Sequence, residues 1–104
     1  MTKAKKAKLE AVIVTTDKRG VFFGYVPSAA KIPLGEDKET TLRNARMCVY
    51  WHESIKGVLG LASDGPNGKC RIGKAVPSIR LRGIHAVLEP TTEAVTAWES
   101  APWA

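Results

Sequence analysis

The 104-residue chain has few of the side chains that enzymes and metalloproteins depend on: two cysteines, two histidines and few central carboxylates. Cys48 and Cys70 are too far apart for a Cys-x-x-Cys site, and His52 and His85 show no metal-ligand spacing. The carboxylates form no obvious pair that would divide general acid and base roles. The sequence therefore predicts a binding protein and not an enzyme, with no metal and no cofactor. A nucleophilic pair of Cys48 and His85 stays open, because such partners meet only in the fold.

Long apolar runs are also missing. None approaches the roughly 18 residues that a membrane span needs. The lysine-rich first residues lack the apolar core of a secretory signal, and no cysteine pattern indicates an oxidising compartment. We therefore expect a cytosolic protein with no membrane partner.

Positive charge is present in excess, with 16 Lys and Arg against 10 Asp and Glu and a net charge of +6. Such a charge favours phosphate-bearing or polyanionic partners. Part of it lies in residues 1–9, a basic tail that contains Lys3, Lys5, Lys6 and Lys8 and has no apolar face. We expect residues 10–104 to form one domain, and the tail leaves nucleic-acid binding open as an alternative.

Residue patterns predict an α+β fold, mainly an antiparallel β-sheet of about five strands with a short central helix and a short C-terminal helix. A β-hairpin is expected at the beginning of the domain, and a surface loop over 28–38. The expected strands are 10–15, 21–26, 39–51, 69–75 and 79–88. Helices are expected over 54–62 and from Pro90-Thr91-Thr92-Glu93, where a threonine is available to cap the second one, with Trp103 sealing its end.

The longest expected strand carries basic and polar side chains. Simple alternation gives it two faces, and the more polar face consists of Leu42, Asn44, Arg46, Cys48 and Tyr50. Arginine forks pair with phosphates and stack on bases, and a nearby Tyr50 or Trp51 offers a stacking face. The other interpretation is a solvated basic sheet face whose aromatic neighbours belong to the core.

The strongest turn signal is Asp64-Gly65-Pro66-Asn67-Gly68. The following lysine and cysteine do not complete a P-loop, because that motif needs a glycine where Ser63 stands and a Ser or Thr where Cys70 stands. A tight turn is expected instead, whose backbone N–H groups can still hold an anion.

Three separated segments carry a resemblance over about residues 19–103. They are Arg19-Gly20-Val21-Phe22-Phe23-Gly24, then Leu42-Arg43-Asn44-Ala45-Arg46 followed by Trp51, and Gly57-Val58-Leu59-Gly60-Leu61-Ala62-Ser63-Asp64-Gly65-Pro66. These segments resemble parts of small phage and prophage proteins. They also resemble the first-type Thoeris anti-defence proteins, phage β-rich oligomers that sequester cyclic nucleotide immune signals without cleaving them.

The resemblance implies a phage-encoded homo-oligomer in the cytoplasm of an infected bacterium that sequesters a cyclic or ADP-ribose-type nucleotide. The expected ligand residues are of two kinds. Those that match the motif are Asn44, Arg46 and Trp51, and those that follow its glycine segment are Asn67, Lys69 and Arg71. Arg46 is expected to lie outside the core. A nucleic-acid-binding phage accessory protein and a virion or assembly component stay open as alternative functions.

Overall fold

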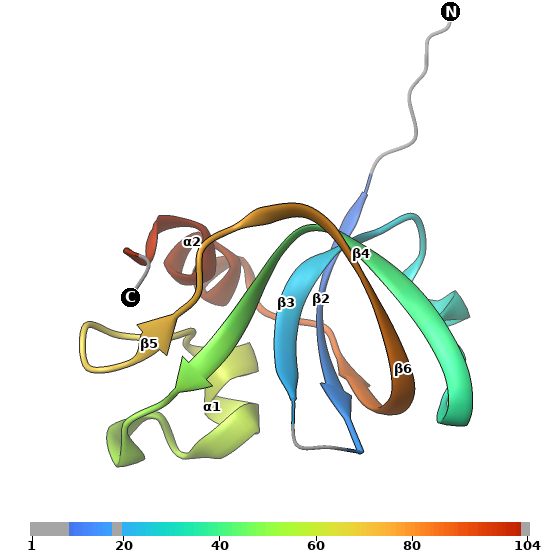
Figure 1. Cartoon of the computed structure of the whole chain (residues 1–104). Coiled ribbons are helices and arrows are strands. Elements are labelled where there is room, and N and C mark those ends of the chain that lie inside the picture. Colours follow the sequence, from blue (N-terminus) through green and yellow to red (C-terminus); the bar gives the residue numbers. More distant parts are fainter. Residues whose placement is uncertain (1–8, 18–19, 103–104) are drawn as a thin grey trace, which may run out of the picture.

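Antiparallel strands dominate the structure, a computed structural model that describes residues 9–17 and 20–102 (Figure 1). The strands are β2 (Glu10–Thr16), β3 (Val21–Val26), β4 (Gly35–Tyr50), β5 (Arg71–Ile72) and β6 (Val76–Leu88). The α-helices are α1 (Gly57–Ser63) and α2 (Thr92–Ser100), and the 3-10 turns are η1 (Ala29–Lys31) and η2 (Glu53–Ile55). The predicted α+β fold with a mainly antiparallel sheet is confirmed.

The sheet closes on itself as a small barrel. Its strand order is β3-β2-β6-β4-β5, and an additional β3–β4 pairing joins the two sides of the ring, while β5 is added at the edge of β4. The β2–β3 pair is the predicted hairpin, with Glu10 opposite Val26 and Thr15 opposite Val21. Closure leaves the four ring strands without long free edges, which are the sites of unwanted strand pairing.

Two apolar clusters stabilise the barrel from its two sides. The inner cluster joins side chains from all four ring strands, including Val12, Val14 and Leu42, and so fills the barrel. The outer cluster includes Ile13 and Phe23 from the strands together with side chains of α1 and α2, and lies between barrel and helices. Strand β2 is therefore buried on both faces, which explains its unbroken run of β-branched residues.

Strand β4 contains a bulge that overturns the predicted assignment of its faces. Phe23 pairs with Arg46 and Tyr25 with Arg43, so three steps along β4 oppose two along β3. Asn44, within this interval, has φ 47°, a left-handed conformation that Asn tolerates better than most residues. After the bulge, Arg46 is buried, whereas uniform alternation predicted a polar outer face. That prediction was wrong because alternation cannot continue through an inserted residue.

Strand β6 has a second bulge. Thr15 pairs with Ala86 and Thr16 with Ile84, so His85 is the extra residue on β6. Gly83, two residues before His85, has φ +75°, and a side chain there would meet the Asp17 carboxylate at 2.6 Å. The turn at the end of β2 and the bulge of β6 are thus packed against each other.

The two α-helices cover the outer cluster. The predicted threonine cap of α2 is Thr91, which accepts a hydrogen bond from the Ala94 amide at 3.0 Å. Trp98 of α2 is fully buried, stacks on Phe23 with ring centroids 5.1 Å apart, and donates from its indole to the Leu61 carbonyl at 3.1 Å. These contacts connect α2 to both the barrel and α1.

Several boundaries differ from the prediction. The expected loop 28–38 contains η1 and the first residues of β4, the helix 54–62 is divided into η2 and α1, and the strand 69–75 is reduced to β5. The expected tail lies mostly outside the described residues, as does Trp103. In the part of the chain that the structure describes, no helix is long and apolar enough to cross a membrane.

Candidate functional site

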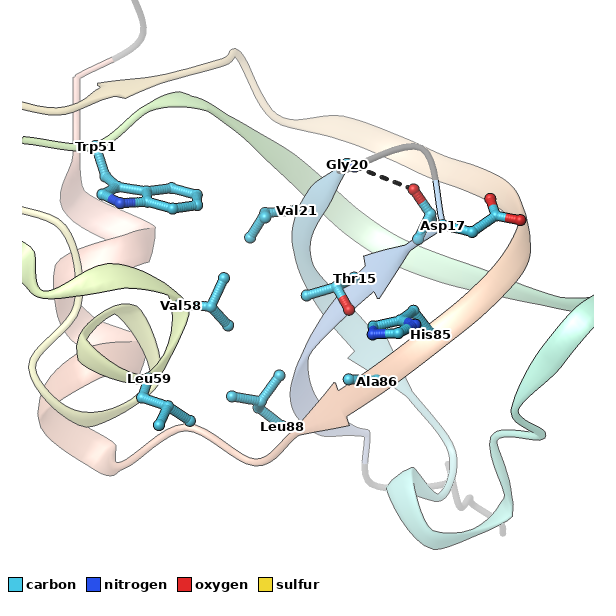
Figure 2. A pocket seen from close by; sticks show the side chains of 11 residues that line it. Thr15, Asp17, Gly20, Val21, Trp51, Val58, Leu59, His85, Ala86 and Leu88 are labelled. Carbon is cyan, nitrogen blue, oxygen red and sulfur yellow. Dashed lines mark hydrogen bonds between the residues drawn. The ribbon is translucent and has the colours of Figure 1, made fainter.

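An open groove of about 790 Å³ lies between the barrel and α1 (Figure 2). One wall comes from the ends of β2 and β6 and the beginning of β3, and the other from α1 and the residue that follows β4. The lining residues are Thr15, Thr16, Asp17, Gly20, Val21, Trp51, Val58, Leu59, His85, Ala86 and Leu88. Most of this lining is apolar, and a few polar groups gather at one side, as in small-molecule sites of proteins.

Thr15 provides the most unusual polar group of the groove. Thr15 is 9% exposed, and its Oγ1 is buried without a hydrogen-bond partner among the residues that the structure describes. Figure 2 shows this hydroxyl on the side of His85. Burying a hydroxyl without a partner costs on the order of 1–3 kcal/mol. The fold therefore retains an unpaired donor and acceptor at the wall of an apolar groove.

The turn between β2 and β3 and the bulge of β6 position the remaining polar groups. The Asp17 amide donates to the Gly83 carbonyl at 3.0 Å, and the Gly20 amide donates to the Thr16 hydroxyl at 3.1 Å. The bulge directs His85 into the groove, which is a common use of bulges beside binding sites. An imidazole there can donate or accept a hydrogen bond.

The opposite side of the groove is apolar. Trp51 is half-buried and packs at the margin of the outer cluster, whereas Leu59 on α1 is 75% exposed. Figure 2 shows Trp51 and His85 at opposite ends of the cavity, with Val58 and Leu88 between them. An indole at one end and hydrogen-bonding groups at the other suit a ligand with a flat ring and polar edges.

Asn44 and Arg46 lie elsewhere, at a second hollow of about 600 Å³ that Tyr25 and Glu99 also line. Arg46 is 7% exposed, and its guanidinium donates to the backbone carbonyls of Gly73, Trp98 and Ala101 at 2.7–2.8 Å. Burial lowers the pKa of Arg46 below its usual value. The expectation that Arg46 lies outside the core is wrong, because the bulge at Asn44 turns its side chain toward α2.

Beside Arg46, the Tyr25 hydroxyl donates to the Glu99 carboxylate, which adds a second polar link between the barrel and α2. Burial is the main cause that raises the pKa of Tyr25, and the hydrogen bond to Glu99 raises it further. The polar groups at this hollow therefore hold α2 in place.

The other expected ligand residues are divided between two places. Trp51 lines the groove, whereas Asn67, Lys69 and Arg71 lie together on the predicted turn and on β5. The Asn67 amide donates to the Ser54 hydroxyl at 3.1 Å and its oxygen accepts from the Lys69 amide at 2.9 Å. Arg71 is exposed opposite Tyr50. Three of the six thus lie within five residues of one another in the chain, Trp51 lines the groove, and Asn44 and Arg46 line the second hollow.

The open alternative of a nucleophilic pair finds no support in the geometry. His85 lines the groove, but Cys48 is buried in the outer cluster and is not among the lining residues. Burial, and to a smaller extent the nearby Cys70, raises the pKa of the Cys48 thiol to about 11, the opposite of what a nucleophile needs. Within residues 9–17 and 20–102, no group of three or more His, Cys, Asp and Glu side chains could hold a metal ion.

Sequence reasoning missed the polar side of the groove. Thr15 stands in a strand of β-branched residues, where a threonine gives no sign of being functional. His85 becomes a groove residue through a bulge, and the available sign was Gly83 within an otherwise alternating strand, since glycine in a strand often marks a bulge.

The fold and the groove together define a class: a small closed β-barrel with helices on one side and an open apolar cavity of ligand size. The chain belongs to the family described as Domain of unknown function (DUF6948), whose model matches residues 9–98. That match includes every residue of the groove. A search of the curated proteins and a search of the solved structures found no match to this chain.

Proposed function

We propose that this protein binds a nucleotide in the groove and does not transform it, and that it acts as a phage-encoded sponge for a nucleotide immune signal in the infected cell. The observation that carries the proposal is the buried, unpaired Thr15 hydroxyl in the wall of an apolar cavity that also contains Trp51. Less than 1 Å² of this oxygen is exposed, so a side chain of the wall must turn before a ligand can bond to it, and that bond then relieves a cost that the free protein bears.

The groove offers counterparts for the base of a nucleotide. The flat base lies against the Trp51 indole, and its polar edge meets the Thr15 hydroxyl and the His85 imidazole. The apolar side chains of α1 exclude water from the base. A cavity of about 790 Å³ is within the range of small-molecule sites.

The resemblance to the Thoeris anti-defence proteins is the reason for proposing an immune signal as the ligand. Trp51 belongs both to the resembling segments and to the lining of the groove. Because the Arg46 guanidinium bonds to backbone carbonyls at the end of α2, the proposal assigns no phosphate binding to Arg46. Exposed cations that could meet the phosphate are Lys69 and Arg71, and Arg71 lies opposite Tyr50, the residue before Trp51.

Titration calorimetry with cyclic di- and trinucleotides and with cyclic ADP-ribose isomers tests the proposal. We expect one of these ligands to bind, and mass spectrometry to recover it unchanged after the protein is denatured. Leu59→Ser should weaken binding by roughly tenfold, because the side chain lines the groove. Leu34→Ser is the matched control, since Leu34 is also exposed but lies outside the groove.

If none of these ligands binds, the nucleotide proposal is wrong. If a bound ligand is recovered in cleaved form, the protein is an enzyme and the sponge interpretation fails. Equal affinity of the Leu59 and Leu34 variants would place the ligand outside the groove.

A further inference from the structure

A second surface, separate from the groove, carries positive charge along the β4–β6 pair. In this pair Thr41 lies opposite Arg80, Glu39 opposite Arg82 and Arg43 opposite Ser78. The alternating residues Leu42 and Leu81 are buried in the inner cluster, so the partners on either side of them point outward. We call the outward set Glu39, Thr41, Arg43, Ser78, Arg80 and Arg82 the basic ribbon.

The three arginines of the basic ribbon are exposed and chemically available. Among the residues that the structure describes, none forms a hydrogen bond or an ion pair with the side chains of Arg43, Arg80 or Arg82. Glu39 is the one carboxylate in the set, and it too makes no such contact. Arg80 and Arg82 are two residues apart on one strand, a spacing of about 6.6 Å. Like charges this close repel each other, and the Glu39 carboxylate opposite Arg82 offsets only part of that repulsion.

The basic ribbon borders a hollow of the barrel surface. Leu9, the first described residue, lines a hollow of about 630 Å³ together with Thr41, Arg43 and Asn44. Arg43 of the ribbon therefore lines a concave part of this surface.

We propose that the basic ribbon binds the phosphate backbone of nucleic acid. Arginine forks and the hydroxyls of Thr41 and Ser78 are ordinary phosphate donors. The ribbon presents no aromatic side chain on which bases would stack, so binding should be independent of sequence and strongly dependent on salt. Strands β4 and β6 run side by side along the barrel (Figure 1), so the ribbon offers the nucleic-acid backbone a continuous binding surface.

Fluorescence anisotropy with labelled duplex DNA, single-stranded DNA and duplex RNA, each at several salt concentrations, tests this proposal on the full chain. We expect binding at low salt to at least one of these polymers, whatever its sequence. The double variant Arg80→Gln/Arg82→Gln should lose about tenfold or more in affinity, and for duplex DNA its log–log salt slope should fall by about 1.8. The control Lys31→Gln/Lys56→Gln removes the same charge from exposed positions elsewhere and should lose much less.

The proposal fails if no polymer binds at low salt, if the double variant binds like the unaltered protein, or if the control loses as much affinity as the double variant. It also fails if the protein binds phosphatidylserine vesicles and not nucleic acid, since the ribbon would then be a membrane-facing surface. Leu59→Ser, which alters the groove, should leave polymer binding unchanged. Failure here and failure of the nucleotide proposal are therefore distinguishable.

Discussion

The guanidinium of Arg46 on β4 donates a hydrogen bond to the backbone carbonyl of Trp98 on α2 at 2.8 Å, across 52 positions of sequence. The same nitrogen donates to the Ala101 carbonyl at 2.7 Å. Carbonyls in the last turn of a helix have no intrahelical partner, and a cation there also complements the helix dipole. Arg46 therefore acts as a side-chain cap that fixes the end of α2 on the barrel.

Arg46→Ala should destabilise the protein by about 2–4 kcal/mol, because it removes charge-assisted hydrogen bonds and leaves buried carbonyls unpaired. Chemical denaturation measures this change. Arg43→Ala is the matched control, since Arg43 is exposed on the same strand and its loss should cost about 0.5 kcal/mol or less. Equal stability of the two variants would mean that the Arg46 contacts contribute nothing.

Stability should decrease as the pH rises from about 9 to 11, because burial raises the pKa of the Cys48 thiol from 9.0 to about 11. The unfolded thiol releases its proton first, so across this window the unfolded chain binds fewer protons and is favoured. Below pH 9 the contribution is complete. Denaturation midpoints of the unaltered protein and of Cys48→Ala at pH 8, 9 and 10 measure the effect.

The Cys48→Ala variant should show a smaller decrease between pH 9 and 10 than the unaltered protein. Cys70→Ala is the control and should keep most of the decrease, since burial of Cys48 and not the nearby thiol is the main cause of the shift. A decrease of the same size in Cys48→Ala would assign the effect to other groups. Tyr25, whose pKa is also raised, should add to the loss at higher pH.

The protein should form a homo-oligomer through the exposed apolar end of β4. Met47 and Val49 are 42% and 58% exposed, and the neighbouring Tyr50 is 50% exposed. Covering such an apolar surface with a second copy lowers the free energy of the assembly. Sedimentation at micromolar concentration should show a species larger than 11.3 kDa, and Val49→Lys should reduce it to the monomer. A monomer in the unaltered protein contradicts this prediction.

The sequence predicted those parts of the fold that depend on local chemistry. The hairpin of β2 and β3 follows from β-branched runs on either side of a turn, and α2 begins where Thr91 can cap it. The faces of β4 were predicted wrongly, because a bulge depends on pairing with β3, which no local pattern encodes. Arg46 moved from an expected ligand site to a helix cap for the same reason.

The groove could not be predicted from the sequence, for a different reason. Its two walls come from segments about 40 residues apart, the turn after β2 and the helix α1, and they meet only when the barrel closes. Trp51 was predicted through the resemblance. Thr15 needed the structure, since its significance is that its hydroxyl is buried without a partner.

Thr15→Val provides the most direct test of the groove as a nucleotide site, because the replacement keeps the shape of the side chain and removes the unpaired hydroxyl. Stability and ligand affinity should change in opposite directions. The variant should unfold at a higher denaturant concentration, by up to about 1 kcal/mol, since a buried polar group without a partner is gone. Calorimetry with the nucleotide that the unaltered protein binds should show affinity lower by roughly tenfold. A variant that is more stable and binds that nucleotide equally well would contradict the account.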